Sequence, residues 1–136
     1  MIPSALARKL VIRPGNSVLV VNAPAGYLES LVPLPEGATA TDRAGGSFDV
    51  VQLFANSRQE LEERLRDAMR AVQPGGILWV SYPKLASKGA GDLSRDRIRE
   101  LVDESTDWTT VSQVAVDDTW SALRLRPAED VKSSRR

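Results

Sequence analysis

The sequence contains no cysteine and no histidine among its 136 residues. Without cysteine the chain has no disulfide, no thiolate nucleophile and no cysteine-bound metal. Without histidine it also lacks the commonest general base and the commonest zinc ligand. These absences exclude most familiar catalytic constellations, so we predict no catalytic residue set and no metal site from the sequence.

The chain also lacks a net charge, because 18 Lys and Arg residues balance 18 Asp and Glu residues. Both signs are spread along its whole length, so no basic stripe is present that would follow a phosphate backbone. We therefore expect no nucleic-acid partner.

Long hydrophobic runs are missing as well, since the apolar runs are about the length of strands and residues 1–10 do not have the pattern of a secretory signal. We expect a cytoplasmic protein with no membrane partner. Hydrophobic residues make up 42% of the chain, which is ordinary for a globular protein. Residues 1–126 are interpreted as one domain, and the polar residues 127–136 as a disordered tail.

Four segments have the character of parallel strands. Ser17–Val21, Phe48–Phe54 and residues 76–81 are apolar on both faces, which is typical of strands buried inside a parallel sheet. Residues 38–41 are a shorter and weaker candidate. Residues 110–116 and 119–126 alternate around Asp117 and Asp118, which predicts an antiparallel hairpin at the sheet edge.

Two helices are expected between these strands. Ser57 and Glu60 have the spacing of a capping box, in which the serine oxygen and the Glu60 carboxylate satisfy two backbone amides. An apolar stripe follows this cap, and residues 74–76 (Pro-Gly-Gly) are expected to end the helix. A second, shorter helix begins after Ser94. Strands that alternate with helices predict an α/β fold with a mixed, mostly parallel sheet, helices on both faces and a C-terminal antiparallel hairpin.

Residues 10–26, 48–51 and 71–80 resemble the Rossmann-like class I S-adenosylmethionine-dependent methyltransferases. In that family a Pro-Gly turn precedes the first strand, and a G-x-G-x-G loop follows it. The positions of the three loop glycines carry Asn22, Pro24 and Gly26 in this chain, and the acidic position within the first strand is Val20. These departures fall mainly on the cofactor loop. Proline at position 24 supplies no amide hydrogen that a cofactor could accept. Asp42 has the place of the family's ribose-binding acid, and its alternative role is that of a turn residue.

A closer resemblance is to an uncharacterised bacterial family, a domain of unknown function with a truncated methyltransferase-like fold. Four segments carry this resemblance: residues 22–27, 48–54, 81–84 and 117–124. The family implies no reaction.

Ligands of open α/β sheets bind beyond the carboxyl ends of the parallel strands. The polar and aromatic residues expected at that edge are Asn22, Tyr27, Tyr82, Lys84, Asp117, Asp118 and Trp120. Each has a structural alternative as a turn, core or solvated residue. If the domain were catalytic, Lys84 would be the base and Asp118 would tune it, but a lysine beside acids keeps a high pKa.

We therefore expect a domain that is not an enzyme, has no cofactor and binds a small molecule or a protein partner at this edge. The alternative is a methyltransferase that binds S-adenosylmethionine through an atypical loop. A homodimer is also expected, because residues 32–37 expose apolar side chains beside a weak edge strand. A monomer in which Leu6 and Leu10 cover that surface is the alternative.

Overall fold

A computed structural model describes residues 2–84 and 92–134. The helices are α1 (Ala5–Lys9), α2 (Tyr27–Ser30), α3 (Arg58–Ala71), α4 (Arg95–Ser105) and α5 (Ala128–Ser134). The strands are β1 (Ser17–Val21), β2 (Thr39–Thr41), β3 (Phe48–Phe54), β4 (Val72–Pro83), β5 (Trp108–Ala115) and β6 (Trp120–Pro127).

The six strands form one mixed sheet in the order β2-β1-β3-β4-β6-β5. Strands β2, β1, β3 and β4 are parallel, whereas β6 is antiparallel to both of its neighbours, β4 and β5. The predicted mixed α/β fold with a C-terminal hairpin is therefore confirmed. Because β6 lies between β4 and β5 and runs opposite to both, β5 points in the same direction as β4 without pairing with it.

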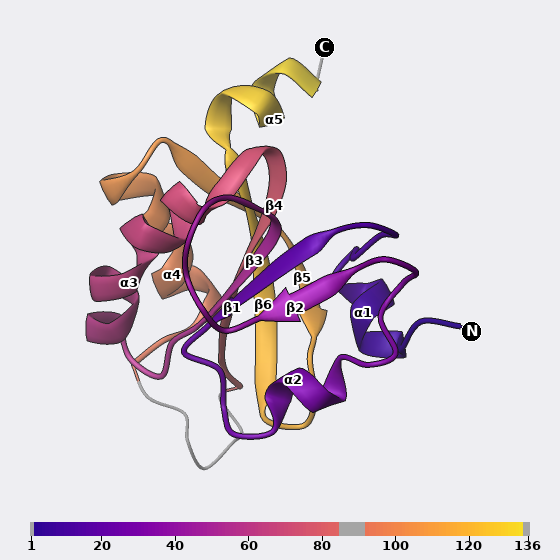
Figure 1. The fold of residues 1–136 in the computed structure, drawn as a ribbon. Coiled ribbons are helices and arrows are strands. Elements are labelled where there is room, and N and C mark those ends of the chain that lie inside the picture. The colour runs from indigo at the N-terminus through magenta and orange to yellow at the C-terminus, as the bar shows by residue number, and fades with distance from the viewer. Residues whose placement is uncertain (1, 85–91, 135–136) are drawn as a thin grey trace.

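Helices cover both faces of the sheet (Figure 1). Successive residues of a strand point to opposite faces, so Leu19 belongs to one core cluster and its neighbours Val18 and Val20 to the other. The first cluster packs under α3 and α4, and the second packs under α1 and α2. Both faces of β1 are thus apolar, as its sequence predicts.

The long helix α3 begins where the capping signal places it, since Ser57 Oγ accepts a hydrogen bond from the Glu60 backbone amide at 3.2 Å. It ends earlier than the Pro-Gly-Gly signal predicts. Val72 is already extended, with φ −83° and ψ 130°, and its side chain is buried as the first residue of β4. The Pro-Gly-Gly segment lies within β4, where a Cβ on Gly76 would stand 2.8 Å from the Asp49 carbonyl oxygen. Glycine is required there because β3 and β4 shift register at this point.

Residues 127–134 differ from the predicted disordered tail. Pro127 ends β6, and the Ala128 amide, which begins α5, donates to the Asp107 carbonyl at 2.8 Å. Residues 135–136 of that tail lie outside the described residues. Among the helices of the described ranges, none has both the length and the apolar composition needed to cross a bilayer.

The N-terminal segment covers part of the surface around residues 32–37, as the monomer alternative requires. The Ser4 amide donates to the Pro33 carbonyl at 2.8 Å, and Leu6 and Leu34 both pack against the second core cluster. Val32 nevertheless remains 59% exposed. The homodimer stays a prediction. The apolar side chain of this surface that remains available for a contact between two copies is Val32.

Candidate functional site

The candidate site lies where the direction of the chain connections reverses. Strand β1 pairs with β2 on one side and with β3 on the other, so the carboxyl ends of β1 and β3 form a topological switch point. Ligands of open α/β sheets bind at this point, because the loops that follow the two strands diverge there. Asn22 follows β1, and Asn56 follows β3 by two residues. The switch point is thus flanked by two polar side chains.

Glu60, in the first turn of α3, holds its carboxylate between these two asparagines. Its Oε1 accepts from the Asn22 side-chain amide at 3.0 Å and from the Asn56 backbone amide at 3.1 Å. The Asn22 amide also donates to the Phe54 carbonyl at 2.9 Å, which joins the end of β1 to the end of β3. Among the described residues Glu60 forms no ion pair. A carboxylate without a cation therefore stands at the switch point, near the positive end of the α3 dipole.

The loop after β1 keeps one open backbone position. Asn22 has φ +60° and Gly26 has φ +78°, and a Cβ built on Gly26 would meet no atom within 4 Å. Pro24 contributes its carbonyl to the turn by accepting from the Tyr27 amide at 3.1 Å. The loop thus turns sharply into α2 and leaves the backbone at Gly26 accessible to a ligand.

A buried chain of hydrogen bonds anchors α2 to the sheet. Tyr27 is 6% exposed, and its hydroxyl donates to Gln52 Oε1 at 2.7 Å. Gln52 Nε2 in turn donates to Ser81 Oγ at 2.9 Å, so the chain connects α2, β3 and β4. The Tyr27 ring packs edge-on against Phe54, whose ring packs edge-on against Trp120. This aromatic row forms an apolar floor beside the switch point.

Burial raises the pKa of Tyr27 well above its ordinary value near 10, and the charge of Asp117 raises it further, against a lowering by the hydrogen bond with Gln52. Unfolded Tyr27 loses its proton near pH 10, whereas folded Tyr27 keeps it. Above pH 10 the unfolded chain therefore binds fewer protons, and stability falls as the pH rises. We expect the free energy of unfolding of the wild type to fall more steeply between pH 10 and pH 11.5 than that of Tyr27→Phe. Urea titrations at several pH values measure this slope, and equal slopes would contradict the burial of a protonated Tyr27.

The other predicted site residues are divided between the two faces of the sheet. The Lys84 amide donates to the Thr119 carbonyl at 2.8 Å, so the end of β4 lies beside the turn that contains Asp117 and Asp118. Asp117 closes that turn by accepting from the amides of Thr119 and Trp120. In Figure 1 this turn and α2 lie together at the lower end of the sheet. Tyr82 does not join them, because it is buried in the cluster under α3 and α4, near Ser121 and Arg95.

Sequence reasoning placed Asn56 at this edge but missed other residues that connect it, which are Phe54, Gln52, Ser81 and, above all, Glu60. Glu60 is assigned to the capping box from the sequence. In the structure its carboxylate accepts from the amide of Asn56, one residue before the expected Ser57, and from Asn22. The signal that could have found it is a carboxylate six residues after the strand that borders the switch point.

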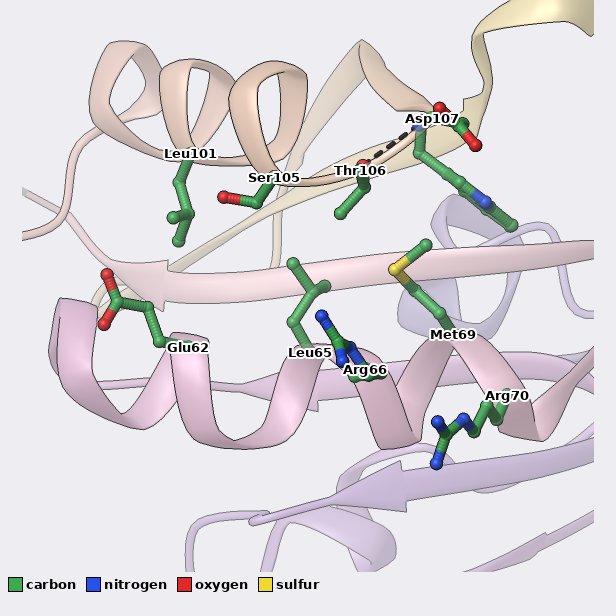
Figure 2. A pocket seen from close by; sticks show the side chains of 10 residues that line it. Glu62, Leu65, Arg66, Met69, Arg70, Leu101, Ser105, Thr106 and Asp107 are labelled. Carbon is green, nitrogen blue, oxygen red and sulfur yellow. Dashed lines mark hydrogen bonds between the residues drawn. The ribbon is translucent and has the colours of Figure 1, made fainter.

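A separate groove of about 520 Å³ lies between α3 and α4. In Figure 2 Leu65 and Met69 of α3 and Leu101 of α4 point into the space between the helices, and Trp108 lines the same groove. The groove includes the end of α4 and the first residue of β5, so it lies toward the amino-terminal ends of the strands. Its volume is that of a ligand pocket. We place the candidate site at the switch point instead, because polar groups from three segments converge there.

Comparison with solved structures shows the same fold in methyltransferases. The complex of DhpI with S-adenosylhomocysteine (SAH) is 16% identical, with a TM-score of 0.62, and the match covers 90% of this chain and 82% of that one. Ribosomal protein L11 methylase from Lactobacillus delbrueckii subsp. bulgaricus is 13% identical, with a TM-score of 0.61, and covers 90% and 74%. Magnesium protoporphyrin IX methyltransferase from Synechocystis PCC 6803 with bound SAH is 13% identical, with a TM-score of 0.56, and covers 89% and 80%. No protein-family model and no curated protein matches the sequence.

These likenesses confirm the methyltransferase-like fold and correct two expectations. The sequence led us to expect a domain that is not an enzyme and has no cofactor. Yet the domains that share this fold over nine-tenths of the chain include methyltransferases solved with S-adenosylmethionine (SAM) or SAH. The loss of loop glycines misled the prediction, because the sequence does not show that a carboxylate from α3 reaches the same edge.

Proposed function

We propose that this domain binds SAM at the switch point and is a SAM-dependent methyltransferase with an atypical cofactor loop. The observation that carries the proposal is the position of the Glu60 carboxylate, between Asn22 and Asn56 and without an ion-pair partner among the described residues. The likeness to methyltransferases solved with SAM or SAH supports it.

The residues present fit the chemistry of this cofactor. SAM carries an ammonium group, a carboxylate and a ribose diol. Glu60 would accept hydrogen bonds from the ammonium group, and the open backbone at Gly26 would face the carboxylate. Asp42, the residue after β2, would accept hydrogen bonds from the ribose hydroxyls. Asn22 and Pro24 replace glycines in the loop, and Val20 stands where the family has an acid within β1. The Glu60 carboxylate from α3 would take the place of that acid.

SAM supplies an electrophilic methyl group when it is bound. The chain's own contribution is to hold the acceptor in line and to exclude water, which is where much of the acceleration of a bimolecular transfer originates. The row of Tyr27, Phe54 and Trp120 provides the apolar wall for this purpose. Lys84 follows the end of β4, where its backbone amide donates to the turn that contains Asp117 and Asp118, and we propose that its side chain contacts the acceptor.

Isothermal titration of the full chain with SAM and with SAH tests the proposal. We expect one site per chain and micromolar or tighter affinity for both. The absence of heat at millimolar ligand, with circular dichroism showing a folded protein, would overturn it.

A further inference from the structure

Three arginines form a cluster toward the amino-terminal ends of the parallel strands, away from the switch point. Arg124 and Arg126 are two residues apart on β6 and therefore lie on the same face of the sheet. Arg13, which lies before β1, is close enough for its charge to act on Arg124. Burial lowers the pKa of Arg124, and the positive charges of Arg126 and Arg13 lower it further. Arg124 is thus repelled by two like charges.

No carboxylate neutralises this cluster among the described residues, whose ion pairs join Arg58 to Glu62 and Arg99 to Asp103. Arg124 also carries an orphaned donor. Its Nε is buried and has no hydrogen-bond partner, and within the described ranges it is the one side-chain nitrogen or oxygen in that condition. A buried donor without a partner destabilises the folded state. A bound water or ion is one explanation of such a group in a folded protein.

A cavity of about 300 Å³ adjoins the two strand arginines. Residues 74–76 of β4 form one side, and Trp108 and Pro127 contribute apolar surface. Asp130, an exposed residue of α5, is the one acid among the residues that line it. The space is large enough for a small anion with its first waters.

We propose that this cavity, the Arg124 site, binds a small oxyanion of the phosphate class. Guanidinium groups present planar, forked donors that match the oxygens of phosphate, and a multivalent anion neutralises several positive charges at once. Such an anion would neutralise the charges of the guanidinium groups that line the cavity and remove the repulsion between Arg124 and Arg126. The inference stands apart from the proposed SAM site, because the two sites share no residue.

Thermal unfolding of the full chain in sodium phosphate, compared with sodium chloride at equal ionic strength and pH, tests this inference. We expect saturating phosphate to raise the Tm by about 5 °C or more above the chloride value. Equal Tm values in the two salts would show charge screening only and would overturn the inference. A shift produced by succinate but not by phosphate would overturn the assignment to the phosphate class.

Variants separate binding from a structural role. Arg126→Gln is expected to lose most of the phosphate-dependent shift, while its Tm in chloride stays equal to that of the wild type or rises, because one like charge is gone. Arg64→Gln, an exposed arginine on α3, is the matched control and should keep the full shift. Arg124→Lys keeps the charge but loses the fork, so it should shift less than the wild type. A full shift in Arg126→Gln would overturn the site.

Discussion

Replacing Glu60 with glutamine is expected to weaken the binding of SAM and SAH by at least about tenfold, because a charge-assisted hydrogen bond contributes about 1.5–3 kcal/mol. Glutamine keeps an oxygen that can accept from Asn22 and from the Asn56 amide, so the switch point retains its geometry. The variant therefore removes the negative charge and little else. Isothermal titration against the wild type measures the change in Kd.

Two controls make this result specific. Glu63→Gln removes a carboxylate from α3 that accepts from Gln59 at 3.1 Å, and it should leave the affinity unchanged. 5′-Methylthioadenosine lacks the amino acid part of SAM, so its affinity should be the same for the wild type and for Glu60→Gln. An equal loss for both ligands would mean that Glu60 supports the fold of the site and does not contact the ammonium.

Replacing Trp79 with alanine is expected to lower the free energy of unfolding by about 3–5 kcal/mol, the usual cost of deleting a large buried aromatic side chain. Trp79 is 1% exposed, and its indole Nε1 donates to the Leu10 carbonyl at 3.0 Å. The substitution opens a cavity and also leaves that carbonyl without its donor. The free energy of unfolding of domains of this size is about 5–15 kcal/mol, so the substitution removes a large share of it. Chemical denaturation measures the loss.

Trp79→Phe divides this effect into its two parts. Phenylalanine keeps most of the apolar volume and removes the donor, so it should cost about 1–3 kcal/mol, the usual cost of an unpaired buried group. Trp108→Ala, at a half-buried position on the edge strand β5, should cost less than Trp79→Ala. A loss below about 1 kcal/mol for Trp79→Ala would contradict the anchoring of the N-terminal segment by this side chain.

Most of the elements follow from short-range patterns. The β-branched run of β1 and the serine caps of α3 and α4 appear in the structure where the sequence places them. The end of α3 was misplaced, because the β-branched Val72 fits the helical stripe by spacing but lies beside Phe48 in the sheet. Sheet pairing with a distant strand decided that boundary, and no local signal reports such pairing.

The candidate site was predictable as an edge but not as a set of contacts. Asn22, Lys84 and the turn with Asp117 reach the carboxyl edge, as strand direction alone requires. Strand direction does not show on which face of the sheet a side chain lies. Tyr82 was therefore grouped with residues on the opposite face. Whether the predicted residues bind a ligand stays a prediction.

By itself the sequence determined the class of fold and the absence of cysteine and histidine chemistry, because these depend on composition and on short-range patterns. The order of helices and strands also predicted strand direction, because a helical crossover joins parallel strands and a short turn joins antiparallel ones. Only the tertiary structure decided that Glu60 meets Asn22, 38 residues away in the chain, and that Arg124 is left with a buried donor. The physical reason is that such contacts depend on how strands pair and how helices pack across the sheet. Strand pairing and helix packing join residues far apart in the chain. A local sequence pattern is compatible with several such arrangements and does not decide among them.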